Sequence, residues 1–509
     1  MKLPKPYLLL TLVAVAHVIL RLAIPHPGFM RDDLLYLVQG HHPAFGYASV
    51  PPLTAWISAV SSFFFGNSIW AAKVYPALLS GVMVFLVAGV AKEMSAGPNG
   101  ILLSVAAYSA GPLYLRSFYM LQPVCTDVFL WTVIWYLILR VINGNSRSWY
   151  ALGIAIGLGL LNKYLIGLQV VALLILMPFT PYRNWFYRRE FWMATGLAAV
   201  IFLPNVVWQM VHHWPLLNHL RALHDNQLVH VDYAGFLTDQ MLMPFAGALL
   251  TIPGFVVLLV APDMRPYRVV GWAVALIFLF LLLVSGKSYY TGGLFVPLIG
   301  AGAWWWSTLL RRTWSVWAMV ALLALLTIPV IPISLPVYPV ERLAAYYDRL
   351  ESKYGLEIGR RFEDGTIHAL PQDFADMLGW DELARVTHQA YVLAGGPEKT
   401  MIYAENYGEA GAVAIIGHEL GLPEPVSFHE SYLYWAPREI PKTVHSLIYI
   451  NDELGEDVEA FFGQVDSIGQ ITNPLAREFG TTVYLCREPS APLQKLWQSA
   501  LDRVAGNPF

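Results

Sequence analysis

Charged side chains are scarce in this sequence. Asp, Glu, Lys and Arg make up only 13% of its 509 residues, hydrophobic residues make up 56%, and the formal net charge is −3. Without a basic excess, nothing in the composition indicates nucleic acid as a partner. The charge-poor stretches are long enough to cross a hydrocarbon core of roughly 30 Å, so the composition predicts a polytopic membrane protein.

Cysteine is nearly absent, since Cys125 and Cys486 are the only two. They form neither a zinc-ligand spacing nor a disulfide framework, so the cysteines do not indicate in which redox compartment the protein lies. The sequence also lacks a glycine-rich phosphate loop of the Rossmann or Walker kind, and a nucleotide-binding domain is therefore not expected. It shows no short-period repeat or low-complexity tract, which excludes a solenoid.

A signal-peptide cleavage site is missing as well. A short basic flank and a long apolar run open the chain, but no small-residue cleavage site precedes Arg21 and His26. We therefore expect a first helix that is retained, not a signal peptide that is removed.

Hydropathy predicts about 11 transmembrane helices. Their expected ranges are 6–24, 68–91, 98–115, 118–142, 148–162, 165–180, 191–208, 240–261, 269–285, 290–308 and 314–334. Alternate loops on one side carry most of the basic residues, namely Lys2, Lys5, Lys92, Arg147, Arg183, Arg188, Arg189, Arg265, Arg268, Arg311 and Arg312. The loops on the other side carry fewer, chiefly Arg31, Arg116, Lys163, Arg221 and Lys287. By the positive-inside rule, the N-terminus is cytoplasmic, and Asp32, Asp33 and the tail after Pro336 lie outside.

The composition changes once, at about Ser334, to that of an ordinary soluble protein. The tail then contains a segment suited to a helix, Val340–Tyr354, and three short β-like segments, Thr400–Tyr403, Ser446–Tyr449 and Thr482–Leu485. We therefore expect a transmembrane domain over residues 1–334 and a soluble α/β domain over residues 335–509, which is large enough for a core of its own.

Five polar clusters stand at the outer ends of the expected helices. They are Asp32-Asp33 with Gly46-Tyr47 and Pro51-Pro52, Gln122-Pro123 with Asp127, Asn162-Lys163-Tyr164, the loop from Trp208 to Gln240, and Gly286-Lys287-Ser288-Tyr289-Tyr290. The two prolines would start a short helix along the membrane interface. If the spans pack as one bundle, all five clusters converge on a single outward-facing cavity.

Each cluster also has a purely structural interpretation. A lysine at a helix end, such as Lys163 or Lys287, is usually a snorkelling anchor, and Tyr289-Tyr290 alone would fit an aromatic belt. Asp127 within an apolar helix indicates function by default, the alternative being a hydrogen bond to a neighbouring helix. The pair Asp32-Asp33 alone would serve as a helix cap.

The outer loops also hold eight of the fourteen histidines: His26, His41, His42, His212, His213, His219, His224 and His230. They favour a metal site only weakly, because the adjacent His212 and His213 would point to different faces of a helix or strand.

The order of these motifs carries more information than any one of them. An acidic pair is followed by G-Y-x-x-x-P-P-L-x-x-W, Q-P-x-x-x-D, G-L-G-L-L-N-K-Y and K-x-Y-Y. Over about residues 6–310 this order resembles the GT-C glycosyltransferases of the protein O-mannosyltransferase and aminoarabinose-lipid A transferase superfamily. It is more similar to the bacterial glycosyltransferase family 39 (RgtA/B/C/D-like) proteins.

Three motifs of the tail look like the C-terminal domain of one bacterial subgroup of that family. They are L-P-Q-D-F-A-D-M-L-G-W-D-E-L from Leu370, N-Y-G-E-A-G-A from Asn406 and H-E-S-Y-L-Y-W from His429. The chain reads Asp32-Asp33 where the family commonly reads Asp-Glu, which leaves the role of the second carboxylate open.

The resemblance implies an inverting glycosyltransferase of the bacterial inner membrane. It would move a hexose or pentose from a polyprenyl-phosphate carrier to a lipid, glycan or protein acceptor of the cell envelope, on the outer face and among membrane lipids. No cofactor is required by this chemistry, and a divalent cation stays open. A polytopic transporter and a non-catalytic envelope-assembly or binding protein are the alternatives.

The resemblance also implies roles for single residues. Asp32 would be the general base, with Asp33 as the second catalytic candidate. Lys163 and Lys287, with Arg221 or Lys73, would hold the donor phosphate and stabilise its growing charge, and Tyr289 would donate to the same oxygens. The remaining candidates for substrate binding are Tyr47, Gln122, Asp127 and Tyr290.

Overall fold

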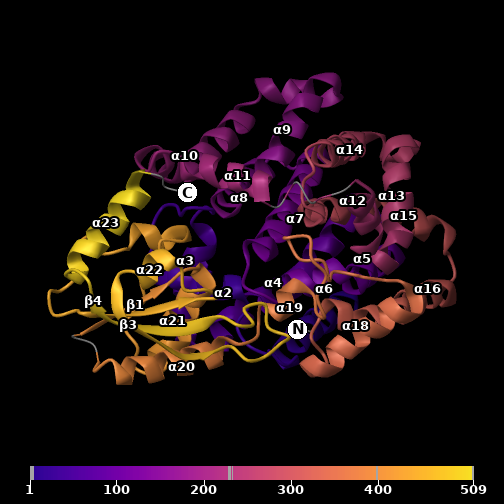
Figure 1. Ribbon diagram of the computed structural model, residues 1–509. Coiled ribbons are helices and arrows are strands. Elements are labelled where there is room, and N and C mark those ends of the chain that lie inside the picture. Colours follow the sequence, from indigo (N-terminus) through magenta and orange to yellow (C-terminus); the bar gives the residue numbers. More distant parts are fainter. Residues whose placement is uncertain (1–4, 227, 229–230, 232, 397–398, 507–509) are drawn as a thin grey trace.

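The computed structural model describes residues 5–226, 228, 231, 233–396 and 399–506. Lys2 and His230, which entered the expectations above, lie outside the described residues. The chain folds into a helical part followed by a tail that contains a small sheet (Figure 1).

The helical part has long helices separated by short turns. Its α-helices are α1 Lys5–Ala23, α2 Arg31–His41, α3 Leu53–Phe65, α4 Ile69–Glu93, α5 Pro98–Ala110, α6 Pro112–Ser117, α7 Pro123–Ile142, α8 Ser148–Asn162, α9 Ile166–Leu176, α10 Arg189–Val211, α11 Pro215–Asn226, α12 Tyr233–Leu242, α13 Ala248–Val260, α14 Arg268–Leu283, α15 Phe295–Leu309, α16 Thr313–Thr327 and α17 Ile331–Ser334. Short 3₁₀ turns are η1 Met177–Phe179, η2 Pro181–Tyr187, η4 Phe245–Gly247, η5 Pro262–Tyr267, η6 Ser288–Leu294 and η7 Ile328–Val330.

Each expected range holds a helix, but not each helix is long enough to span a membrane. Among the described residues, five helical segments meet the length and hydropathy of a span: Ile69–Glu93, Pro123–Ile142, Arg189–Val211, Pro262–Leu283 and Thr313–Ser334. Two bent pairs, Ile166–Phe179 with Pro181–Tyr187 and Tyr233–Leu242 with Phe245–Val260, raise the number to seven, and three shorter apolar helices remain. The chain is thus a multi-pass membrane protein, while the expected number of spans stays a prediction.

The helices depart from expectation in two places. The single helix expected over 98–115 is split into α5 and α6 at Gly111-Pro112, because proline has no N–H to donate and starts a new helix. The two prolines at 51–52 do precede a short helix, α3, as expected. The loop expected from Trp208 to Gln240 is wrong, since it contains α11 and most of α12.

The tail contains a four-stranded sheet with helices around it. Its elements are α18 Val340–Tyr354, α19 Gln372–Ala375, α20 Trp380–Leu393, β1 Thr400–Ala404, α21 Tyr407–Glu419, η8 Glu430–Tyr434, β2 Ser446–Asn451, α22 Glu456–Glu459, β3 Phe462–Gln470, β4 Thr482–Pro489 and α23 Leu493–Gly506. The strand order is β1-β2-β4-β3, with β1 parallel to β2 and the other two pairings antiparallel. The expected helix and the three expected strands are confirmed.

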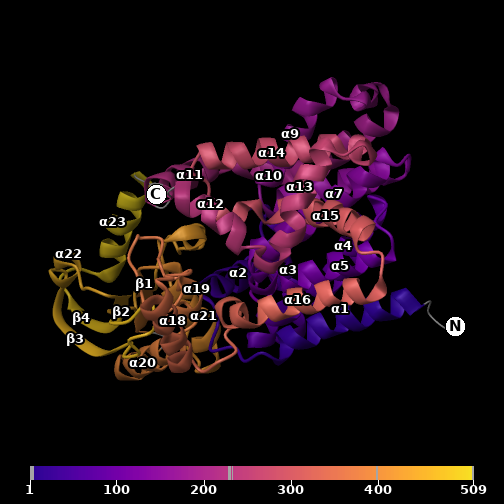
Figure 2. The ribbon, with the colours of Figure 1, turned by 90° about the vertical axis from the view of Figure 1, so that its right-hand side faces the viewer.

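The tail packs directly on the helical part, at one end of it (Figure 2). One buried core contains Leu34 and Leu37 of α2 together with Trp380 of α20 and Val413 of α21. Because apolar groups of both parts leave water together in this core, the tail is held against the first turn of α2, where the acidic pair lies.

Candidate functional site

The acidic pair opens α2, and its two carboxylates have different surroundings. Asp33 is fully buried. Its Oδ2 accepts a hydrogen bond from the backbone N–H of Met30 at 3.1 Å, and its Oδ1 accepts one from Leu121 N–H at 2.8 Å. Burial raises the pKa of Asp33 to about 7, although both N–H donors act in the opposite direction. Asp33 thus ties the start of α2 to the turn before α7, as a helix cap does.

Asp32 is partly exposed and is held by side chains. Its Oδ1 accepts a hydrogen bond from the Tyr407 hydroxyl at 2.8 Å, and its Oδ2 accepts one from Gln122 Nε2 at 3.3 Å. Burial raises the pKa of Asp32 above its ordinary value, and the bond from Tyr407 and the charge of Arg31 partly offset this rise. A carboxylate with a raised pKa is a stronger proton acceptor, which suits a general base.

Lys163 follows the last residue of α8 and meets the late K-x-Y-Y motif. Its Nζ lies 5.0 Å from the ring centre of Tyr289 and 4.5 Å from that of Tyr290. Its positive charge also acts on Asp127 of α7. Aromatic faces attract a cation while leaving its N–H groups free for an anion. The second, third and fifth polar clusters therefore come together around one ammonium group.

Lys287 lies near Lys163 but is paired with the tail. The two lysine charges interact with each other, and the Nζ of Lys287 donates to Glu363 Oε1 at 2.5 Å. Burial would raise the pKa of Glu363, but Lys287 and a hydrogen bond from Gln372 outweigh it and keep that pKa below its usual value. Lys287 is therefore a cation whose present partner is a carboxylate of the tail.

Three expected binding residues are engaged elsewhere or exposed. The Tyr47 hydroxyl lies 2.9 Å from the carbonyl oxygen of Gln39 and 3.0 Å from that of His42, and it fixes the turn after α2. Lys73 donates to the carbonyl oxygens of Leu22 and Ile24 at 3.1 and 2.9 Å, which closes the end of α1. Arg221 is exposed on α11. The structure thus gives Tyr47 and Lys73 structural contacts.

Sequence reasoning missed the residues that the tail contributes, above all Tyr407 and Glu363. The N-Y-G-E-A-G-A motif contains the signal, because its glycines let α21 approach α2 closely. A Cβ atom on Gly408 would lie 2.7 Å from Cγ of Arg31, and one on Gly411 would lie 2.7 Å from Cβ of Leu34. Glycine at such positions indicates backbone packed closely against another element.

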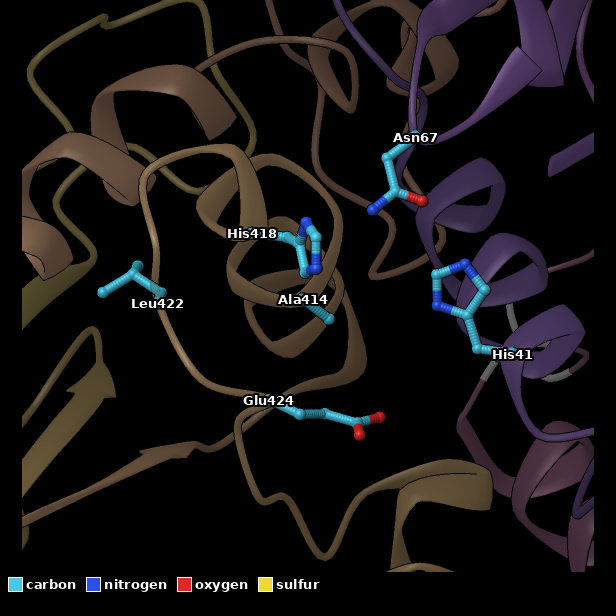
Figure 3. A pocket seen from close by; sticks show the side chains of 6 residues that line it. All are labelled: His41, Asn67, Ala414, His418, Leu422 and Glu424. Carbon is cyan, nitrogen blue, oxygen red and sulfur yellow. The ribbon is translucent and has the colours of Figure 1, made fainter. Parts of the chain in front are cut away.

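The histidines of the outer loops do not assemble a metal site in the described part of the chain. No group of three or more His, Cys, Asp or Glu side chains there is arranged to hold a metal ion. One of these histidines, His41, borders a cavity of about 290 Å³ near the far end of α2, where His41 and Asn67 face His418 and Glu424 of the tail (Figure 3). Cys125 and Cys486 are both buried and free.

Comparison with known proteins finds partial similarity to membrane transferases. Residues 49–208 match the family model described as dolichyl-phosphate-mannose-protein mannosyltransferase. Over 40% of its length the chain is 28% identical to the lipopolysaccharide core galacturonosyltransferase RgtA of Rhizobium johnstonii, covering 41% of that protein. It is 27% identical, over 35% of its length, to the undecaprenyl phosphate-alpha-4-amino-4-deoxy-L-arabinose arabinosyl transferase 1 of Pseudomonas fluorescens, covering 32% of that protein.

These matches span less than half the length of either curated relative, whereas the structural likeness extends over nearly the whole chain. The structure of ArnT from Cupriavidus metallidurans bound to undecaprenyl phosphate superposes with a TM-score of 0.60 at 15% identity, covering 94% of this chain and 97% of ArnT. At that identity the likeness concerns the fold. The chain therefore has the GT-C fold that the order of its motifs predicts.

Proposed function

We propose that the chain is an inverting glycosyltransferase that moves a sugar from a polyprenyl-phosphate carrier to an acceptor of the cell envelope. One observation carries the proposal: the candidate general base and the two lysines lie close together, linked through Tyr289 and Glu363. The negative charge of Asp32 acts on the Tyr289 phenol, and the Tyr289 ring packs on Lys163. Glu363, which binds Lys287, also acts on Asp32.

The chemistry follows from this arrangement. Asp32 accepts the proton of the acceptor hydroxyl as its oxygen attacks the anomeric carbon of the donor sugar. The bond from that carbon to the phosphate oxygen breaks, and its electron pair leaves with the polyprenyl phosphate. Lys163 and Lys287 bind this phosphate and stabilise the negative charge that grows on it. Attack from the face opposite the phosphate inverts the configuration at the anomeric carbon.

The comparisons support the donor class. The ArnT structure that superposes on this chain contains undecaprenyl phosphate, and the curated relatives transfer galacturonic acid or 4-amino-4-deoxy-L-arabinose. Under this proposal, the transferred sugar is a hexose or a pentose. The acceptor is a lipid, glycan or protein of the envelope, and a divalent cation would take part only through the substrate phosphate, to which Mg²⁺ commonly binds.

The proposal is tested by transfer from defined donors. Membranes containing the chain are given polyprenyl phosphates that carry radiolabelled hexoses or pentoses, with envelope extract from cells lacking the gene as the acceptor. Label should move into one acceptor class, and envelope glycans of cells with and without the gene should differ in that class. Absence of transfer from every polyprenyl-phosphate donor, with unchanged envelope glycans, would reject the enzyme.

The proposed orientation places the site and the tail on the non-cytoplasmic face. Arg31 of α2, Arg116 of α6 and Lys287 before η6 all pair with carboxylates of the tail, so these segments and the tail share one side. Single cysteines at Ser49 and Ser467, in a chain lacking Cys125 and Cys486, should react with an impermeant thiol reagent added to intact spheroplasts.

The control for this labelling is a single cysteine at Ser146, which is exposed but on the opposite side of the bundle and should stay unlabelled. Ser467 is exposed on β3, so its labelling does not depend on local opening. Labelling at Ser146 with protection at Ser467 would show an inverted orientation.

Glu363 is expected to compete with the donor for Lys287. Replacing Glu363 by Gln removes the negative charge that Lys287 now binds, so the KM for the donor should fall by about twofold to fivefold, the range expected for a partly exposed ion pair. Glu357→Gln is the matched control, because Glu357 pairs with Arg361 on the surface of the tail. A higher donor KM in Glu363→Gln would mean that Glu363 positions Lys287 instead of occupying it.

A further inference from the structure

The first residue of α21 reaches across to α2. Tyr407 follows Asn406, whose side chain accepts hydrogen bonds from the backbone N–H groups of Gly408 and Glu409, while the Glu409 side chain binds Asn406 N–H in return. This reciprocal cap fixes the start of α21. The Tyr407 hydroxyl projects from it to within 2.8 Å of Asp32 Oδ1.

We propose that Tyr407 is a positioning residue for the general base, so that the soluble tail completes the active site of the membrane part. The inference rests on the proposed function, in which Asp32 is that base. The Tyr407 bond holds Oδ1. Among the described residues, Oδ2 has only the longer 3.3 Å contact with Gln122, so it is the oxygen that can take the proton of the acceptor hydroxyl. A carboxylate fixed at one oxygen cannot rotate away from the substrate.

Close packing keeps the tyrosine in place. The guanidinium carbon of Arg31 lies 4.4 Å from the ring centre of Tyr407, and the ring of His429 lies 5.3 Å away. Because Gly408 and Gly411 have no side chains, α21 can pack closely against Arg31 and Leu34 of α2. The tail is also linked to the helical part at Arg116, whose Nε donates to Asp373 Oδ2 at 2.6 Å. Packing between the tail and the helical part therefore keeps the Tyr407 hydroxyl directed at Asp32.

The electrostatic effect of the hydroxyl has a definite sign. A hydrogen bond to the ionised carboxylate favours that form, so it lowers the pKa of Asp32 against the rise that burial causes. Arg31 acts in the same direction, while Glu363, Asp373, Asp33 and Asp376 act in the opposite direction. All five of these charged groups stay in a Tyr407→Phe variant, so only the contribution of the hydroxyl changes.

The test is the pH profile of sugar transfer by Tyr407→Phe in the full-length protein. Loss of the bond should raise the pKa of Asp32, so that the acid limb of kcat moves up by about one pH unit. Below that limb, transfer should fall by about tenfold, since each unit changes the ionised fraction by that factor. The donor KM should not change, because Tyr407 does not contact the lysines.

Tyr449→Phe is the matched control. Its hydroxyl also donates to a carboxylate of the tail, Glu405 Oε2 at 2.9 Å, but on β2 and away from Asp32. Its pH profile should equal that of the unaltered protein. An unshifted acid limb in Tyr407→Phe, while Asp32→Asn is inactive, would overturn this inference alone. Full activity of Asp32→Asn would instead overturn the proposed function, so the two failures are distinguishable.

Discussion

Asp32→Asn should lower sugar transfer by about 10²–10⁴-fold, the usual contribution of a positioned general base. Asparagine keeps the size of the side chain, and its amide oxygen can still accept the bond from Tyr407, but it cannot take a proton from the acceptor. The measurement is the rate of label transfer by purified protein at saturating donor. Because Asp32 is partly exposed and its carboxylate accepts no backbone hydrogen bond from the described residues, the melting temperature should stay the same.

Asp33→Asn is the matched comparison. It should lower the stability of the protein and reduce sugar transfer less than Asp32→Asn does. Both oxygens of Asp33 accept backbone N–H groups, and an amide NH₂ in place of one oxygen would face an N–H that it cannot bind. A buried unsatisfied donor costs about 1–3 kcal/mol, so the free energy of unfolding should fall by about that amount. Greater loss of transfer in Asp33→Asn than in Asp32→Asn, without loss of stability, would assign the base to Asp33.

The sequence was informative about polar clusters at the outer ends of the expected helices. Lys163, Tyr289 and Tyr290 are expected to converge if the spans pack as one bundle, and the structure brings them together. For two other candidates, Tyr47 and Lys73, the structure instead shows structural contacts. The Tyr47 hydroxyl and the Lys73 ammonium group both donate hydrogen bonds to nearby backbone carbonyl oxygens. Such local hydrogen bonds depend on how a turn closes, which spacing does not reveal.

Tyr407 shows what could not be predicted. It lies far from Asp32 in the sequence, in a domain with its own composition, and nothing local indicates that α21 packs on α2. The glycines at 408 and 411 indicate a close approach, but not to which element. Edge strand β3 was missed for another reason. Its sequence contains two glycines and several polar residues, and it is held mainly by its pairing with β4.

The helix α11 was missed because its apolar residues lie on one face. Leu216, Leu217, Leu220 and Leu223 follow helical spacing, while Asn218, His219, Arg221 and His224 occupy other positions of the helix. When hydropathy is averaged over a window of sequence, this segment has the polar character of a loop. Its position matters for the site, because the charge of Lys287 acts on His219, which brings the fourth polar cluster to the lysine pair.

Lys163→Met should have the second largest effect, because, of the two lysines at the site, Lys163 is the one that no carboxylate hydrogen-bonds among the described residues. Methionine keeps an apolar stem of similar length against the rings of Tyr289 and Tyr290 but removes the charge that the donor phosphate needs. We expect kcat/KM for the donor to fall by about 10²–10³-fold, the usual cost of losing one group that stabilises a developing anion. Lys163→Arg, which keeps the charge, should retain more activity.

The control for this loss is Lys92→Met, at the exposed C-terminal end of α4. Lys92 has the character of a snorkelling lysine and lies on the side expected to face the cytoplasm, so its removal should leave the donor saturation curve unchanged. The measurement is transfer rate against donor concentration at fixed acceptor. If Lys163→Met and Lys92→Met gave the same saturation curve as the unaltered protein, Lys163 would be an anchor like Lys92. The phosphate would then have to bind Lys287 alone, after displacing Glu363.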